Sequence, residues 1–136
     1  MKKEKLKRFG VAIPEGLLLK FDNYIREKNY KNRSEAIRDL IRAEFVKENW
    51  VLNKECAGVI SIVYNHHKRE LVDKIVDIQH DYQDIIVASQ HIHLDHDNCL
   101  EVIITRGNSK KIQALADKLK SAKGVNHTAL SFTSVV

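Results

Sequence analysis

Residues 84–106 read DIIVASQHIHLDHDNCLEVIITR, two apolar stretches around a polar centre. The stretches at 84–94 and 99–106 predict two strands, and the polar sequence Asp-His-Asp-Asn at 95–98 predicts the turn that joins them. In such a hairpin, directly paired residues share a face of the sheet with their Cβ atoms about 5 Å apart. The rest of the fold can be worked out from this hairpin in both directions.

The sequence on either side of the hairpin completes one domain. Alternation at 58–65 and 126–134 predicts two further strands, and apolar residues at helical spacing predict helices over 68–81 and 109–123. Gly124 then acts as a helix terminator. The order strand-helix-strand-strand-helix-strand indicates a ferredoxin-like sandwich, an α+β fold in which two helices cover one face of a sheet.

The N-terminal part of the chain follows a different pattern. Residues 8–13 alternate in the manner of a half-buried strand, which the proline that follows ends. Helical spacing predicts a first helix over 14–28. Asn32 and Glu35 have the spacing of a capping box at the start of a second helix, which we expect to end near Trp50.

A lone strand does not complete a fold, because its backbone donors and acceptors remain unpaired. We expect the strand at 8–13 to pair antiparallel with the same strand of a second chain, which gives a dimeric ribbon-helix-helix domain (βαα). The side chains that would cover the helices are Phe9, Val11 and Ile13. Those on the outer face would be Arg8, Gly10 and Ala12. A two-stranded ribbon has the right width for the major groove of B-DNA.

Composition and charge narrow the class of protein. The 136 residues are 43% hydrophobic and 30% charged, as in globular proteins. The net charge of +5 lies within residues 1–49, because the remainder holds equal numbers of basic and acidic residues. This excess favours nucleic acid as a partner. No apolar run approaches the roughly 18 residues that span a bilayer and the start lacks a signal peptide's apolar segment, so we expect a cytoplasmic protein without a membrane partner.

These patterns divide the chain into three parts. We expect a DNA-binding domain over 1–50, a linker over 51–56 and a second domain over 57–136. Two cysteines, Cys56 and Cys99, are too few for a disulfide framework, so that a thiolate ligand becomes a possibility.

The hairpin carries a set of metal-ligating residues. His91 and His93 are two apart on a strand and project from the same face. Pairing about the turn sets His93 opposite Cys99 and His91 opposite Glu101. Two imidazoles and a thiolate suit zinc, copper or nickel better than magnesium or calcium, and the spacing does not choose among them. His80, at the end of the preceding helix, is a candidate fourth ligand.

The alternative to metal binding is that these residues have only a structural role. Seven histidines can produce an i, i+2 pair by chance, and a free cysteine is usually a small core residue. We expect His96, in the turn, to be solvated, and the histidines without evident partners are His66, His67 and His127. Candidates for residues beside the ligands are Tyr64, His66 and Glu101.

Three motifs connect the chain with a known family. They are YKNRSEAIRD at 30–39, IQH at 78–80 and HIHLDHDNCLE at 91–101. With them, the chain resembles the nickel-responsive repressors of the NikR family over nearly its whole length. The first motif also occurs in other ribbon-helix-helix repressors and antitoxins, whereas the three together are far more specific.

The resemblance implies a transcriptional repressor rather than an enzyme. It implies a homotetramer, a dimer of dimers, in which a core of ferredoxin-like (ACT-type) domains carries a DNA-binding dimer at each end. It also implies square-planar Ni(II). The ligands would be His91, His93 and Cys99 of one subunit and His80 of a neighbour.

A second, weaker cation site near the DNA is a further implication of the resemblance. Its ligands would be Glu35 and Asp39, which lie at i, i+4 on one helix face and repel each other unless they are neutralised. Local pairing with basic residues is the alternative. The basic residues at hand are Arg33, Arg38 and Arg42.

The predicted DNA contacts depart from the family pattern. Family members usually have polar residues at the two outward strand positions after the arginine, whereas Gly10 and Ala12 donate no side-chain hydrogen bonds. Only Arg8 keeps a bidentate group for reading base edges. Phosphate contacts would come from Lys2, Lys3, Lys5 and Lys7, together with Arg33 and the helix start at Ser34. The DNA partner would be a double-stranded, palindromic operator.

Two other functions compete with a nickel-responsive repressor. One is a metal-independent ribbon-helix-helix repressor whose ACT-like domain binds a metabolite. The other is a metalloenzyme, since three protein ligands with an open position describe many catalytic zinc sites. The enzyme is disfavoured because the sequence has no nucleophile elbow, phosphate-binding loop or HExxH pattern.

Overall fold

The computed structural model of the chain describes residues 3–136. These residues form two compact units, one up to Ile41 and one from Arg42 onward, and the boundary falls within helix α2 (Arg33–Val51). None of the helices in the described residues combines the length and the hydropathy that crossing a bilayer requires.

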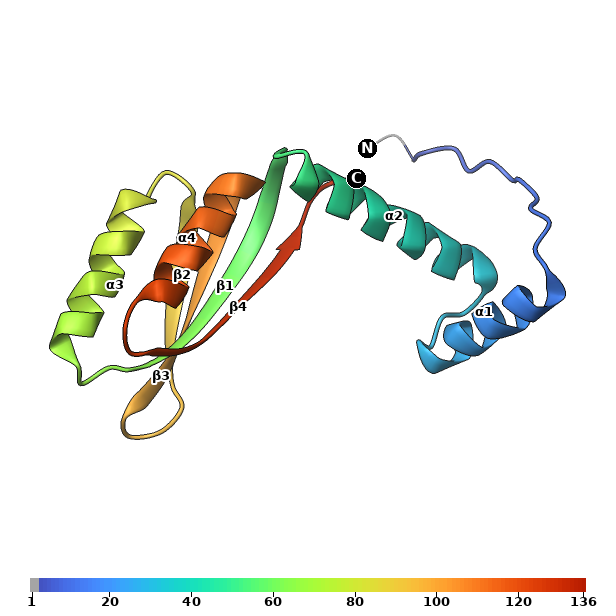
Figure 1. Cartoon of the computed structure of the whole chain (residues 1–136). Coiled ribbons are helices and arrows are strands. Elements are labelled where there is room, and N and C mark those ends of the chain that lie inside the picture. The colour runs from blue at the N-terminus through green and yellow to red at the C-terminus, as the bar shows by residue number, and fades with distance from the viewer. Residues whose placement is uncertain (1–2) are drawn as a thin grey trace. The chain divides into compact units, whose positions relative to one another are not determined.

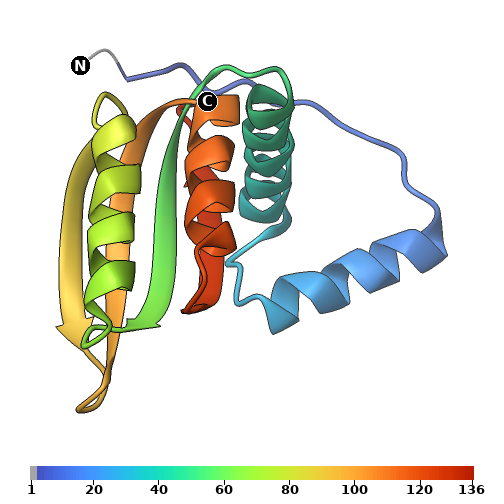
Figure 2. The ribbon, with the colours of Figure 1, turned by 60° about the vertical axis from the view of Figure 1, so that its left-hand side comes forward.

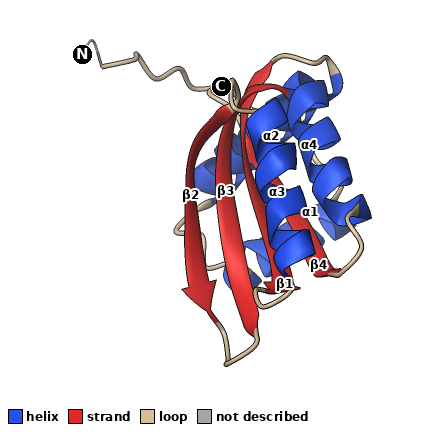
Figure 3. Cartoon of the chain, turned by 90° about the vertical axis from the view of Figure 1, so that its left-hand side faces the viewer, coloured by secondary structure: helices blue, strands red, loops and turns tan. Residues whose placement is uncertain are grey.

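The second unit is an antiparallel sheet with two helices on one face (Figures 1 and 3). The strands lie in the order β2-β3-β1-β4, and helices α3 and α4 cover the same side. This is the predicted ferredoxin-like arrangement. The elements are β1 (Glu55–Asn65), α3 (Arg69–Asp81), β2 (Ile86–His93), β3 (Asn98–Asn108), α4 (Ser109–Ser121) and β4 (Val125–Thr133).

The segment predicted as a linker over 51–56 is shorter than expected. Helix α2 continues to Val51 and β1 begins at Glu55. Strand β1 begins early because β3 extends to Asn108, so that Glu55 pairs with Asn108. Only residues 52–54 connect the helix to the strand.

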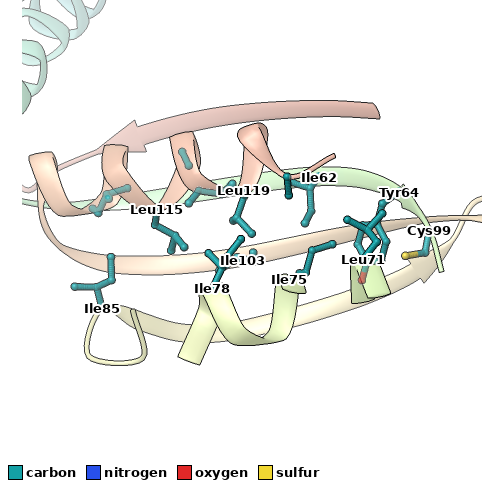
Figure 4. Packing of buried hydrophobic residues seen from close by; sticks show 14 of the residues in the cluster. Ile62, Tyr64, Leu71, Ile75, Ile78, Ile85, Cys99, Ile103, Leu115 and Leu119 are labelled. Atoms are coloured by element: carbon teal, nitrogen blue, oxygen red, sulfur yellow. The ribbon is translucent and has the colours of Figure 1, made fainter. Parts of the chain in front are cut away.

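The core lies between the sheet and the two helices (Figure 4). Alternate residues of β1 and β3 point into it, and Ile60 and Ile103 are fully buried there. The helices contribute Ile75 from α3 and Leu115 and Leu119 from α4. Sequence periodicity predicted this burial, because the inward positions follow a period of two in the strands and of three to four in the helices.

Two glycines are required by this packing. A Cβ at Gly58 would lie 2.8 Å from Ile112 Cγ2 and 2.9 Å from Thr105 Oγ1, so the strand approaches α4 too closely for a side chain. Gly124 has a φ of +104°, a conformation in which L side chains are strained, and it follows the end of α4 as predicted.

The first unit contains helix α1 (Glu15–Glu27) and the start of α2, which Figure 2 shows from a second side. The carbonyl of Pro14 accepts hydrogen bonds from the amides of Leu17 and Leu18, both at 3.0 Å. Asn32 caps α2, since its Oδ1 accepts the amide of Glu35 at 2.9 Å. Both helices therefore begin close to the predicted positions.

The strand predicted over 8–13 does not form in the single chain. Residues 3–14 have no strand hydrogen bonds, and Phe9 and Val11 are 74% and 63% exposed. The physical reason is that the predicted partner strand belongs to another chain, and the first unit has no strand of its own to pair with. The dimeric ribbon therefore stays a prediction, and Lys2 lies outside the described residues.

Truncation of a core side chain is expected to lower the stability of the second unit. Leu119→Ala should reduce the free energy of unfolding by about 2–5 kcal/mol, because it removes a fully buried side chain and leaves a cavity. Urea denaturation at fixed protein concentration measures the loss. Lys120→Ala, next to it on the exposed side of α4, is the control. An equal effect of the two changes would contradict the packing described here.

Candidate metal centre

The register of the hairpin is the one predicted from the sequence. His93 pairs with Cys99 and His91 pairs with Glu101 across β2 and β3. The turn is ordered by Asp95, whose Oδ1 accepts the amides of Asp97 at 2.9 Å and Asn98 at 2.7 Å. These bonds explain why the chain reverses at 95–98.

The three hairpin residues lie on the side of the sheet that the helices cover. Cys99 is 2% exposed and belongs to the core cluster (Figure 4), whereas the side chains of His91 and His93 are exposed. Strand β2 is an edge strand, so one side of this group has no neighbouring strand. A thiol at the margin of the core and two imidazoles beside it form a donor set that fits a late transition metal.

A buried carboxylate adjoins the hairpin residues. Glu101 is 2% exposed, and its Oε2 accepts the hydroxyl of Tyr64 at 2.9 Å while its Oε1 accepts Nε2 of Gln79 at 2.7 Å. The Oε2 atom also lies 3.1 Å from Nε2 of His91. Burial of a polar side chain is costly unless it is hydrogen-bonded, and Tyr64 and Gln79 meet that requirement for Glu101. The contact of Oε2 with Nε2 holds the His91 ring in position.

Tyr64 remains a neutral donor in this network. Burial raises the pKa of its hydroxyl well above the ordinary value, and hydrogen bonds with Cys99 and Glu101 raise it further. The hydroxyl also lies 3.3 Å from Nε2 of His91. Tyr64 therefore links the carboxylate to two of the predicted ligands.

The other predicted metal residues are placed differently. His80 is exposed near the end of α3. Within residues 3–136, the set of histidine, cysteine and acidic side chains whose ligand atoms lie within 4.8 Å of one another is His67, His96 and Asp97. Neither His80 nor the three hairpin residues form a set of this kind in the described part of the chain. Burial raises the pKa of the other cysteine, Cys56, which lies at the start of β1.

Two histidines predicted to lack partners have them. The His66 ring lies 4.2 Å from that of His67 and 4.8 Å from that of His93. His67 contacts the turn, where Nε2 lies 3.0 Å from the carbonyl oxygen of His96. His96 is exposed, as expected, but its Nδ1 also lies 3.0 Å from Asp97 Oδ1. The strand order would have predicted these contacts, because β1 pairs with β3 and the residues after Asn65 therefore lie beside the turn.

The residues predicted for the second cation site have local contacts. A hydrogen bond with Asp39, the largest contribution, raises the pKa of Tyr30 to about 12. Arg33 pairs with Asp22 of α1. Its Nε and Nη2 donate to the two oxygens of Asp22, both at 2.9 Å, which lowers the pKa of Asp22.

The residues predicted to contact DNA lie in two places. Most of them belong to the exposed N-terminal segment, namely Lys3, Lys5, Lys7, Arg8, Gly10 and Ala12. Ser34 is exposed in the first turn of α2, beside Arg33. Arg33 also joins α2 to α1 through its ion pair with Asp22.

Comparison with known proteins shows to which family the chain belongs. Residues 57–133 match the family described as the NikR C-terminal nickel-binding domain. This chain belongs to the NikR family. A protein of Syntrophus aciditrophicus named "Putative nickel-responsive regulator" is 53% identical over 94% of this chain and 93% of its own length. A relative with the same name from Pyrococcus horikoshii is 53% identical over 96% of this chain and 95% of its own length.

Solved structures agree on the fold of the second unit. The ACT domain of a GTP pyrophosphokinase from Chlorobium tepidum has a TM-score of 0.50 at 19% identity, and the match covers 57% of this chain and 100% of that domain. The predicted ACT-type fold is confirmed. Membership of the NikR family confirms the predictions of nickel as the metal and of a regulator rather than an enzyme.

Neutralising Glu101 is expected to weaken nickel binding. Glu101→Gln keeps the shape of the side chain but removes the charge beside His91, and loss of such a supporting partner typically costs about 10–100-fold in metal affinity. Competition with a chelator of known affinity measures the change. Glu70→Gln, at an exposed position of α3, is the matched control. Unchanged affinity in Glu101→Gln would mean that the carboxylate does not support the site.

Proposed function

We propose that this member of the NikR family is a transcriptional repressor whose affinity for a palindromic DNA operator depends on Ni(II). The observation that carries the proposal is the pairing of β2 with β3, which sets His91, His93 and Cys99 on one face of a rigid hairpin. Family membership supports nickel as the ion.

The proposed ligands come from two subunits. His91, His93 and Cys99 would hold the ion from one chain, and His80 would come from a neighbour. The exposure of His80 supports a role toward another subunit. Bound nickel would supply a fixed centre that joins the two chains. The chain's own contribution is to hold His91 through Tyr64 and Glu101.

The outer face of the sheet supports assembly of the second unit. One face of an antiparallel sheet commonly faces water and is then polar. Here the face opposite the helices carries Val59, Ile92 and Ile104, which are 42%, 45% and 44% exposed. Val59 and Ile104 are directly paired across β1 and β3, and exposed apolar residues on one face of a sheet favour contact with another subunit. We propose that it contributes to a tetrameric core.

The first unit supports a dimeric ribbon. Ile25 and Ala36 are its buried hydrophobic residues in the described part of the chain, whereas Phe9, Val11 and Ile41 are exposed. A second copy would cover these side chains and pair the segment at 8–13. The ribbon would then present Arg8 to the major groove.

A cation near the DNA-binding unit is a separate proposal. Glu35 and Asp39 lie one turn apart on α2, and their mutual repulsion favours a cation between them. The Asp39 side chain also forms a hydrogen bond with Tyr30.

Nickel can regulate DNA binding only through different affinities of two states. We propose that joining His80 to the hairpin of a neighbouring chain favours an arrangement of the tetramer in which both N-terminal dimers reach their half-sites. The metal-free tetramer would populate this arrangement less.

Operator affinity is expected to rise with nickel by roughly 5–150-fold, the usual range of allosteric coupling. A random duplex library selected on the nickel-loaded, untagged protein supplies the DNA. Binding of the selected duplex is then measured with Ni(II) and with a chelator present. The variant Cys99→Ala should lose the nickel effect, and His127→Ala, at an exposed position of β4, should keep it. Equal affinity with and without nickel would favour the metal-independent repressor.

We expect different residues of the N-terminal segment to read bases and to contact phosphates. Arg8→Ala should reduce the binding free energy for the selected duplex by about 1–3 kcal/mol and relax the sequence preference of the protein. Lys5→Ala should mainly reduce, by about one, the slope of the logarithm of the binding constant against the logarithm of the salt concentration. Titrations at several salt concentrations on selected and scrambled duplexes distinguish the two effects. If both changes act alike, Arg8 does not read bases.

A further inference from the structure

A second group of potential metal ligands lies at the tip of the hairpin. His67, from the connection between β1 and α3, meets His96 and Asp97 of the turn between β2 and β3. The ligand atoms of the three side chains lie within 4.8 Å of one another. Asp97 Oδ1 is 3.6 Å from His67 Nε2 and 3.0 Å from His96 Nδ1. None of these residues belongs to the set of His80, His91, His93 and Cys99.

The backbone around this group is ordered without help from the three side chains. The amide of His66 donates to the carbonyl of Asp97 at 3.1 Å, which ties the two connections together. The amide of His67 donates to Asn65 Oδ1 at 2.9 Å. Asp95 accepts the amide of Asp97 at 2.9 Å. The ligands therefore project from a fixed frame, which reduces the entropy that binding an ion would cost.

We propose that His67, His96 and Asp97 bind a second late transition-metal ion. Two imidazoles and one carboxylate suit Zn(II), Ni(II) or Cu(II), and leave positions open for water. The carbonyl oxygen of His96, 3.0 Å from His67 Nε2, is a further oxygen donor at the same place.

This site is weaker than the hairpin site and independent of it. Its side chains are 53%, 88% and 59% exposed, for His67, His96 and Asp97 respectively, so water competes for the ion. It has no thiolate and needs no second subunit. Its existence does not depend on the proposed function, because the group is complete within one chain.

The test is a Ni(II) titration of the untagged full-length protein by calorimetry with equilibrium dialysis. The wild-type chain should show a tight binding event and a weaker one. His67→Ala, His96→Ala and Asp97→Asn should each weaken the second event at least about tenfold, since even loss of a supporting partner costs that much. His127→Ala removes a histidine outside the group and should leave both events unchanged.

The double variant with His91→Ala and Cys99→Ala separates the two sites. It should lose the tight event and keep the weaker one, whether or not nickel controls DNA binding. Retention of the tight event in His67→Ala shows in the same sample that the protein is folded. If the weaker event persists unchanged in His67→Ala and His96→Ala, or disappears in the double variant, the proposed site is wrong.

Discussion

The pairing of β2 with β3 is the constraint on which the site depends. Side chains alternate between the two faces of a strand, so a slip of one residue would turn His91 and His93 to the outer face, away from Cys99. The turn bonds of Asp95 fix this register at one end. Burial of Ile103 in the core fixes it further along β3.

Glu101 extends this constraint to the rest of the second unit. Its side chain contacts Tyr64 from β1, Gln79 from α3 and His91 from β2, so that three elements meet at one buried polar group. A buried polar side chain adds little net stability compared with well-packed apolar residues. The presence of Glu101 between the core and the hairpin histidines is therefore better explained by the position that it gives to His91 than by a contribution to folding.

The sequence was sufficient for features that depend on local periodicity. The order of the elements, the register of the hairpin and the capping of α2 by Asn32 all follow from spacing along the chain. Features that depend on distant pairing were missed: β1 begins at Glu55 because β3 continues to Asn108. For the same reason, His67 and its contacts with the turn require the strand order to be known first. The strand predicted over 8–13 would need a partner strand from a second chain, so it stays a prediction.

Several apolar side chains and one potential metal ligand are exposed in the single chain, and the proposed assembly accounts for all of them. Phe9 and Val11 in the first unit and Val59 and Ile104 on the sheet are apolar side chains that a stable soluble protein would normally cover. His80 is exposed and, within residues 3–136, is not grouped with other potential metal ligands. In the proposed tetramer, another copy would cover the exposed apolar side chains and would bring His80 to the hairpin of its neighbour. A fold of this size buries a modest fraction of its surface, so the proposed assembly would supply the missing burial. The same subunit contacts would complete the proposed metal site, and metal binding would then be coupled directly to assembly.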